Sequence, residues 1–475
     1  MPEPHALPTT TARTAPPASH GLDHDLVREL RHQVAERLAA HLQAHPTSDP
    51  GARRELCRAL LAEALAQRAR ERARAGLAAW DVETEFALAE AVMAAVVGLG
   101  RLQPLVDDPG IENIEVNGCD QVWLSYADGR TEPGPAVADS DLELIEHLQR
   151  LAARASTSER TFSTAHPRLH LRLDDGSRLA AMAWTTPRPQ VVIRRHRVRD
   201  VDLDDLIGLG TLDPVLAAFL RASLGAGKNI VVSGLQNAGK TTLIRALANE
   251  FHPAERFATI EREYELHLHE LPERHARVVA MEAREGSAET DAAGRRAGEV
   301  TLAELVVDAL RLNLRRIIVG EVRGGEVLPM LEAMATGDGS LCTIHARTAT
   351  RVIDRIVTLC MAAGVGISEA FAYRLIAGSV DLVVHLHLLD ETHLPGGRRH
   401  RYVSHVLEIG PVSESSRPSL TTVFAPGPDG RAVPAHRPTC LDDLIRAGLD
   451  PSLLDQRGGL WPRPLHRATV QGAWR

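Results

Sequence analysis

The segment from Asn229 to Leu247, NIVVSGLQNAGKTTLIRAL, constrains the fold of this chain more than any other. Its apolar, β-branched residues Ile230 to Val232 predict a buried strand, and the residues after Gly239 predict a helix. Between the two, Gly234 to Thr241 has the spacing G-x-x-x-x-G-K-T of a phosphate-binding loop. A chance match to this spacing is disfavoured, because the flanking residues predict both the strand and the helix that the motif requires.

The residue types of this loop suit a polyphosphate. Glycines let backbone N–H groups converge on the anion, and the following helix directs its positive N-terminal end toward it. Lys240 is expected to reach the β- and γ-phosphates, and the Thr241 hydroxyl is expected to bind Mg²⁺. The predicted nucleotide-binding residues of the loop are Gly234, Leu235, Gln236, Asn237, Ala238, Gly239, Lys240, Thr241 and Thr242.

Lysine is rare in this chain, whereas arginine is abundant. The two lysines are Lys228 and Lys240. An ammonium is a compact point charge, which a planar guanidinium cannot replace on a phosphate. The presence of one of the two lysines inside the loop therefore supports a phosphate contact for Lys240.

Composition excludes several classes of protein. The net charge of −8 argues against a nucleic-acid coat. The five cysteines have no C-x-x-C spacing, which favours reduced structural thiols in a cytoplasmic protein. No apolar run approaches the roughly 18 residues that span a bilayer. We therefore expect a cytoplasmic protein that reaches a membrane, if at all, by docking on partners.

Changes in hydrophobic period suggest the domain organisation. Helical spacing predicts amphipathic helices over 23–45, 53–76 and 82–97, and short strands follow in a small mixed domain. The expected domains are a disordered tail (1–20), a helical extension (21–98), an α+β N-terminal domain (99–200), an α/β domain (207–410) and a C-terminal tail without an assigned structure (411–475).

Strands and helices alternate from about Thr211, which predicts a mainly parallel sheet with helices on both faces. Ligands of such sheets bind outside the carboxyl ends of the strands. The expected strands are 230–233, 257–261, 278–281, 316–320, 341–344 and 382–386.

Three strands of this domain end in side chains that suit phosphoryl transfer. Glu321 and Glu261 each follow an apolar run, where a carboxylate could hold Mg²⁺ through water or orient the attacking water. His345 ends a strand preceded by the glycine-rich turn Thr336–Ser340, and a role in sensing the γ-phosphate is predicted for it. The alternatives are a solvated acidic turn at Glu261 and a structural histidine at His345.

Together these segments resemble the secretion ATPases of the type II/type IV superfamily, most closely the CpaF-like ATPases of Tad/Flp pilus assembly. The resemblance covers residues 80–410. It is carried by the phosphate loop and by the segments 98–105, 113–118, 175–178, 192–195, 299–302, 316–324 and 342–346.

The resemblance implies a RecA-like P-loop core, preceded by a smaller α+β domain with a helical extension. It implies a homohexameric ring with ATP and Mg²⁺ between the two domains of each chain, and with Arg178 and Arg194 reaching the phosphates. Neighbouring side chains of a strand point to opposite faces, so Arg194 and Arg195 cannot both face the nucleotide. The alternative is a basic surface strand.

The chain departs from the family pattern at two places. The acidic segment usually reads Glu-Asp, where this chain has Glu261-Arg262. The glycine turn usually has a histidine after Thr-Gly, where this chain has Asp338-Gly339. We expect both departures to lie near the γ-phosphate, where they would slow hydrolysis.

The leading hypothesis is an ATPase motor in which Lys240, Glu261, Glu321 and His345 are the catalytic candidates. Thr241 is expected to bind Mg²⁺, and Glu321 is a candidate to bind it through water. Its implied partners are further copies of itself and inner-membrane platform proteins of a pilus or secretion apparatus. One rival is a RecA-like nucleic-acid translocase, disfavoured because the basic segment 188–199 lacks interleaved aromatic residues. The other rival is a nucleotide-binding scaffold that does not hydrolyse.

Overall fold

The chain divides into two compact units in its computed structural model. The first unit comprises residues up to 195 apart from 128–130, which belong with residues 196–475 in the second unit. The predicted disordered tail, 1–20, lies outside the described residues. The structure describes residues 23–45, 49–126, 129–154, 162–195, 200–284, 286, 296–364, 366–394, 396–412 and 417–468.

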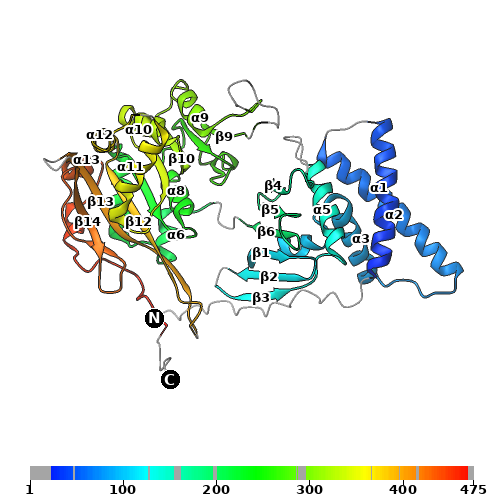
Figure 1. Ribbon diagram of the computed structural model, residues 1–475. Helices are drawn as coiled ribbons and strands as arrows, with labels where there is room; N and C mark the ends of the chain where they lie inside the picture. Colours follow the sequence, from blue (N-terminus) through cyan, green and yellow to red (C-terminus); the bar gives the residue numbers. More distant parts are fainter. Residues whose placement is uncertain are drawn as a thin grey trace, which may run out of the picture. The chain divides into compact units, whose positions relative to one another are not determined.

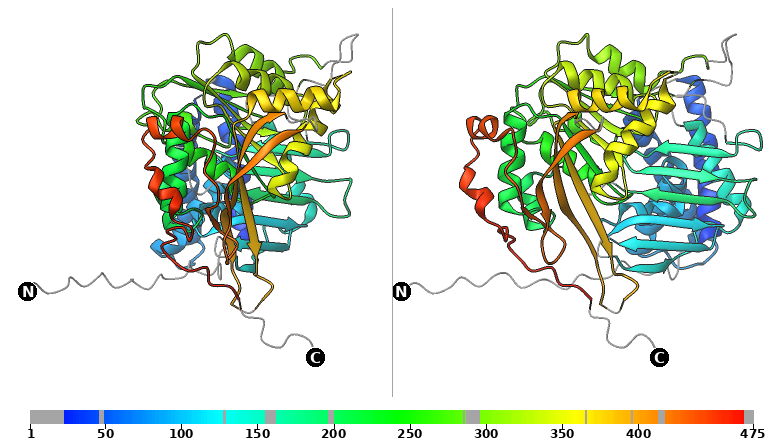
Figure 2. Two further views of the ribbon diagram at one scale, coloured as in Figure 1. Left: turned by 90° about the vertical axis from the view of Figure 1, so that its left-hand side faces the viewer. Right: turned by 60° about the vertical axis from the view of Figure 1, so that its left-hand side comes forward.

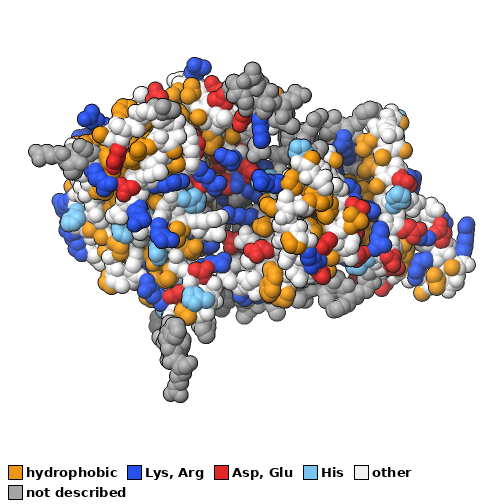
Figure 3. Space-filling view, in the orientation of Figure 1, with side chains coloured by type: hydrophobic (Ala, Val, Ile, Leu, Met, Phe, Trp, Pro, Cys, Tyr) orange, Lys and Arg blue, Asp and Glu red, His pale blue; other side chains and the backbone are white. Residues whose placement is uncertain are grey.

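The first unit begins with the predicted helical extension, a bundle of α1 (His24–Ala44), α2 (Pro50–Arg74) and α3 (Val82–Val97). Each helix starts behind an aspartate whose side chain accepts backbone N–H groups of the first turn, namely Asp23, Asp49 and Asp81. Acidic and basic side chains are mixed over the exposed faces of α1 and α2 (Figure 3), where the ion pairs Arg37–Glu63 and Arg68–Glu29 join the two helices.

An antiparallel sheet forms the rest of the first unit, in the order β3-β2-β1-β6-β5-β4. Buried and exposed residues alternate along its strands, and α5 (Asp141–Arg154) adds Leu144 and Leu148 to the core on the buried face. The other elements of this unit are η1 (Gly100–Leu102), α4 (Gln103–Asp107), β1 (Ile111–Asn117), β2 (Gln121–Tyr126), β3 (Thr131–Gly134), β4 (Arg168–Arg172), β5 (Arg178–Met182) and β6 (Gln190–Arg194).

The second unit is built on a nine-stranded sheet in the order β15-β14-β13-β12-β7-β11-β10-β8-β9. The strands from β12 to β9 in this order are parallel, and they include all the strands expected from the sequence. The bounds are β7 (Ile230–Gly234), β8 (Phe257–Glu261), β9 (Val278–Glu282), β10 (Arg316–Val322), β11 (Leu341–His345), β12 (Leu382–Asp390), β13 (Arg399–Val412), β14 (Pro418–Pro426) and β15 (Ala432–Pro434).

Helices cover both faces of this sheet (Figures 1 and 2), as the alternating pattern predicted. Successive residues of β7 belong to different cores: Ile230 and Val232 pack with α6, α7 and α8, whereas Val231 packs with α9 to α12. Burial on both faces explains why β7 reads as a continuous apolar run. The helices are α6 (Leu203–Gly208), α7 (Pro214–Gly225), α8 (Lys240–Ala248), η2 (Leu268–Glu270), α9 (Leu302–Ala309), α10 (Val327–Thr336), η3 (Ala349–Arg351), α11 (Val352–Ala363) and α12 (Glu369–Ser379).

Residues after 411, for which the sequence pattern predicts no structure, extend this unit. β14 and β15 add antiparallel strands to the edge of the sheet beyond β13, and α13 (Leu441–Arg446) and η4 (Pro451–Asp455) follow. α13 lies beside α7 (Figure 2), and Leu444 is buried in the core of that face. Lys228, just before β7, forms an ion pair of 2.8 Å with Asp443 of α13.

The cysteines are free, as expected: Cys57, Cys119, Cys342 and Cys360 are buried, and Cys440 is half-buried. Among the described residues, no helix is both long enough and apolar enough to cross a membrane.

Candidate active site

The predicted phosphate-binding loop connects β7 to α8. Gly234, Asn237 and Gly239 have φ angles of 155°, 62° and 94°, so the backbone takes left-handed conformations that glycine and asparagine tolerate best. A Cβ at Gly234 would lie 2.7 Å from the carbonyl oxygen of Leu386. Gly239 caps α8 without any side-chain hydrogen bond. The backbone amides of a tight turn and the start of a helix thus lie together, a donor set that fits a polyphosphate.

Lys240 is buried within this loop, at 8% exposure. Its Nζ donates to the carbonyl oxygens of Leu235 (2.9 Å) and Gly234 (3.3 Å), and it lies 3.2 Å from Nδ1 of His345. His345 ends β11 directly beside Gly234 in the sheet register. The structure therefore brings the predicted lysine and histidine into contact.

Glu321 lies on β10, the neighbour of β11, and contacts the same histidine. Its Oε1 is 2.7 Å from Nε2 of His345, and its Oε2 accepts a hydrogen bond of 2.5 Å from Arg323. Burial alone would raise the pKa of Glu321, but the hydrogen bonds from His345 and Arg323 lower this pKa to about 2. Glu321 is therefore a carboxylate at any physiological pH.

These contacts also favour one arrangement of donor and acceptor at His345. The ammonium of Lys240 can only donate, and the carboxylate of Glu321 can only accept. A ring that accepts at Nδ1 and donates from Nε2 satisfies both neighbours. Lys240, His345 and Glu321 thus form a continuous polar chain from the loop to β10.

Glu261 ends β8, beside β10, and is buried at 3% exposure. Its Oε1 accepts from the backbone N–H groups of Glu265 and Leu266, both at 3.0 Å. The Thr241 hydroxyl donates to Oε2 of Glu265 at 3.3 Å. A second chain of contacts therefore leads from the loop to Glu261, which does not lie in a solvated acidic turn.

One expectation about the departures from the family pattern is wrong. The turn at Thr336–Gly339 lies before the amino end of β11, whereas the phosphate loop lies at the carboxyl end, beside His345. Arg316, the first residue of β10, donates to the Gly339 carbonyl oxygen at 3.3 Å, which fixes the turn at the far edge of the sheet. The turn cannot act on a phosphate directly. Arg262, by contrast, follows Glu261 and is exposed.

The predicted arginines of the first unit lie opposite each other in one strand pair. Arg178 of β5 and Arg194 of β6 are register partners, and Arg194 is exposed. Arg195, on the other face, donates to the backbone oxygens of Asp108 and Ile111. The side chains of Arg194 and Arg195 thus point to different sides of the sheet, as strand alternation predicts. A phosphate contact for Arg178 and Arg194 stays a prediction.

Two side chains of this site received no role from the sequence. Glu265 joins Thr241 to Glu261, and Arg323 fixes one oxygen of Glu321. Both have a sequence signal: Glu265 follows Glu261 by four residues, and Arg323 follows Glu321 by two, just past the ends of their strands. Spacing could have drawn attention to them, but it could not show which atoms they contact.

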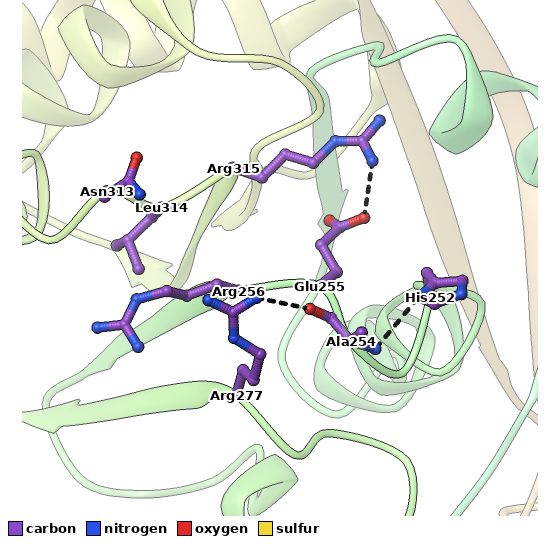
Figure 4. Close-up of a pocket in the computed structure, with 8 residues that line it drawn as sticks. All are labelled: His252, Ala254, Glu255, Arg256, Arg277, Asn313, Leu314 and Arg315. Atoms are coloured by element: carbon purple, nitrogen blue, oxygen red, sulfur yellow. Dashed lines mark hydrogen bonds and ion pairs between the residues drawn. The ribbon is translucent and has the colours of Figure 1, made fainter.

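A hollow of about 440 Å³ lies at the opposite, amino edge of this sheet (Figure 4), and none of the predicted site residues lines it. Arg315 pairs there with Glu255 at 3.2 Å, and Arg277 donates to the carbonyl oxygen of Ala254 at 3.3 Å. Its arginines are held by the protein itself, so the chemistry that the sequence predicted belongs to the carboxyl edge.

One known protein family matches more than half of the chain. Residues 101–405 match the family described as "Type II/IV secretion system protein". The match begins before β1 and ends within β13, so it includes the phosphate loop, Glu261, Glu321 and His345.

The chain is also similar to individual proteins. The chain is 31% identical over 301 residues to a "Putative conjugal transfer protein" of Mycobacterium tuberculosis, covering 61% of this chain and 80% of that protein. It is 30% identical over 332 residues to the "Type IV secretion system protein PtlH" of Bordetella pertussis, covering 64% and 92%. Among solved structures, the VirB11 ATPase of the Brucella suis type IV secretion system is 27% identical, with coverage of 65% and 92% and a TM-score of 0.33.

Proposed function

The chain belongs to the type II/type IV secretion system protein family, and from this premise we propose that it is an ATP-hydrolysing motor of a secretion or pilus-assembly system. The observation that carries the proposal is the convergence of two carboxylates on one phosphate-binding loop, Glu321 through His345 and Lys240, and Glu261 through Glu265 and Thr241. Phosphoryl transfer to water needs such positioned charges more than covalent chemistry.

Each part of the loop has a defined task in this proposal. The amide groups of Leu235 to Lys240 and the N-terminus of α8 bind the phosphates, and Lys240 exchanges its contacts with the loop carbonyl oxygens for contacts with phosphate oxygens. Thr241 and Glu265, which contact each other, would hold a magnesium ion, and Mg²⁺ would neutralise part of the phosphate charge.

The two glutamates position the attacking water in this proposal. Glu321 stays ionised because His345 and Arg323 bind it, so it can accept a hydrogen bond from water at neutral pH. Glu261 is fixed by two backbone N–H groups, which hold its carboxylate in one orientation. Arg178 and Arg194 are proposed to supply the arginine contacts to the phosphates that the family resemblance implies.

We further propose that the chain acts as a homohexameric ring docked on inner-membrane platform proteins, and that it is a CpaF-like member serving Tad/Flp pilus assembly. The support is the resemblance of residues 80–410. Sedimentation with and without MgATP would test the ring: a nucleotide-dependent species of about six chains supports it, and a monomer under both conditions contradicts it.

The ATPase proposal is tested at the two lysines. Lys240→Ala should remove phosphate release from MgATP without lowering the unfolding temperature, because the loop keeps its fold but loses its point charge. Lys240→Arg should also fail, since a guanidinium does not replace the ammonium. Lys228→Arg is the matched control: it can still pair with Asp443 at the amino end of β7 and should hydrolyse ATP normally. Full turnover by Lys240→Ala would contradict the proposal.

A non-hydrolysing scaffold is the second candidate, favoured by Arg262 in place of the usual acidic residue beside Glu261. Phosphate release by the wild type, compared with Glu321→Gln, separates the two candidates. Removing a water-positioning carboxylate should slow hydrolysis by about 10²-fold or more. Equal, negligible release by both proteins, with MgATP still bound, would favour the scaffold.

A further inference from the structure

The hairpin formed by β12 and β13 runs past the phosphate-binding loop. β12 lies parallel to β7 with Leu386 opposite Gly234, and it continues to Asp390, beyond the point where β7 becomes the loop. β13 returns antiparallel, with Arg401 opposite Leu388. This register places Arg401 at the level of the loop although it is 164 residues away from Asn237 in sequence.

Arg401 contacts the loop through its guanidinium group and through the aliphatic part of its side chain, here called the stem. Its Nε donates to the carbonyl oxygen of Asn237 at 2.8 Å. A Cβ built on Gly239 would lie 3.8 Å from Cδ of Arg401, so the stem passes beside that glycine. Arg401 is half-buried in this position. The contact is therefore to the backbone of the left-handed part of the loop.

This part of the loop includes a left-handed residue that is not glycine. Asn237 has a φ of 62°, a left-handed conformation that asparagine tolerates better than most side chains, although less freely than glycine. A hydrogen bond to the Asn237 carbonyl oxygen fixes the plane of the peptide between Asn237 and Ala238, and hence the direction of the following N–H group. The guanidinium also adds a positive charge beside the site of the phosphates.

We propose that Arg401 is a positioning residue of the nucleotide site, which holds the loop in its phosphate-binding shape and couples nucleotide binding to the β12–β13 hairpin. This inference rests on the proposed nucleotide-binding function. Because coupling between two sites is reciprocal, nucleotide binding should in turn order the hairpin. The hairpin and the strands that follow it would thereby respond to nucleotide occupancy.

Arg399 offers a matched control on the same strand. It lies two residues from Arg401, and its Nε donates to Asp390 of its own hairpin at 2.8 Å. Each arginine donates a charged hydrogen bond from its Nε, but only the bond from Arg401 reaches the loop.

The experiment measures MgADP binding by calorimetry and hydrogen exchange of residues 387–403 in the full chain. Arg401→Gln should weaken binding by about tenfold or more, the loss expected for one hydrogen bond from a charged donor, with an unfolding temperature like that of Arg399→Gln. Arg401→Lys should recover binding in part, since it restores the charge but not the guanidinium geometry. Arg399→Gln should bind MgADP within about twofold of wild type, as expected for a partly exposed ion pair.

Hydrogen exchange provides a readout that a merely structural role would not change. MgADP should protect the hairpin amides in the wild type and in Arg399→Gln, but not in Arg401→Gln. The inference is overturned if Arg401→Gln binds MgADP like the wild type, or if MgADP leaves the hairpin of the wild type unprotected. A wild type that binds no MgADP overturns the proposed function as well, which distinguishes the two failures.

Discussion

His385 illustrates how a single buried side chain affects the environment of the loop. It lies on β12 beside β7, and its Nδ1 is 2.9 Å from the Ser233 hydroxyl. Burial, together with the nearby His405, His387 and Lys240, lowers the pKa of His385 to about 4. The ring is therefore neutral in the folded protein at neutral pH. A neutral ring places no second positive charge near Lys240.

This pKa gives a prediction for stability against pH. The folded pKa lies below the ordinary value of 6.5, so the stabilisation is present above pH 6.5 and is lost as the pH falls toward 4, because the unfolded chain takes up the proton first. Between pH 6.5 and pH 4 the free energy of unfolding of the wild type should fall by about 3 kcal/mol more than that of His385→Asn. Urea unfolding at each pH measures this difference. His252→Asn, at an exposed position, should follow the wild type. If the free energy of unfolding had the same pH dependence in all three proteins, the lowered pKa of His385 would be contradicted.

At the scale of elements, the close pairing of β8 with β10 positions the carboxylates. The parallel register sets Ile260 opposite Val319, so that the next residues, Glu261 and Gly320, are neighbours at the sheet edge. A Cβ at Gly320 would lie 2.9 Å from Cγ of Glu261 and 3.2 Å from its Oε1. The absence of a side chain at Gly320 is thus what allows Glu261 to reach its backbone donors.

Gly320→Ala should therefore impair turnover more than binding. The added methyl group displaces Glu261 from the N–H groups of Glu265 and Leu266, whereas the loop on β7 and α8 is untouched. We expect ATP turnover to fall by about tenfold or more, with MgADP affinity within about twofold of wild type. Gly325→Ala, where a Cβ meets nothing within 4 Å, is the control and should behave like the wild type. Unchanged turnover in Gly320→Ala would argue against a catalytic role for Glu261.

At the scale of the whole second unit, the C-terminal residues pack against the start of α7 and the residues next to β15, and they stabilise this unit. Asp213 caps α7 through the N–H of Leu216 at 2.8 Å, and its other oxygen accepts the N–H of Leu460 at 2.7 Å. The buried Arg431 stacks on Trp461, with 4.2 Å between the guanidinium carbon and the ring centroid. Residues near 460 are thus tied to both α7 and β15.

Trp461→Ala should destabilise the second unit by about 2 kcal/mol, through the lost cation–π contact and the lost burial around Arg431. Thermal unfolding of the full chain measures this as a lower transition temperature. Leu460→Ala is the matched control, because its side chain is 46% exposed and its backbone bond to Asp213 is kept. Equal stability of the two variants would show that the contact with Arg431 contributes little.

Local pattern predicted much of the fold and part of the site. Apolar runs and the helical period identified the helices of the extension and the parallel strands, because burial on one or both faces imposes those periods on sequence. Strand ends also drew attention to Glu261, Glu321 and His345. The strands after 411 were missed, since Pro and Ser interrupt their pattern and an antiparallel edge needs no continuous apolar run.

The sequence by itself predicted the phosphate-binding loop. Glycine, lysine and threonine at this spacing restrict both the conformation of the segment and the kind of ligand that it suits. Only the tertiary structure decided which strands flank β7, and so which side chains meet the loop: His345 through β11, and Arg401 through the return of β13. It also decided that the turn at Thr336–Gly339 lies at the far edge of the sheet. The physical reason is that periodicity reports burial within one element, whereas strand order and register arise from contacts between residues a hundred or more positions apart.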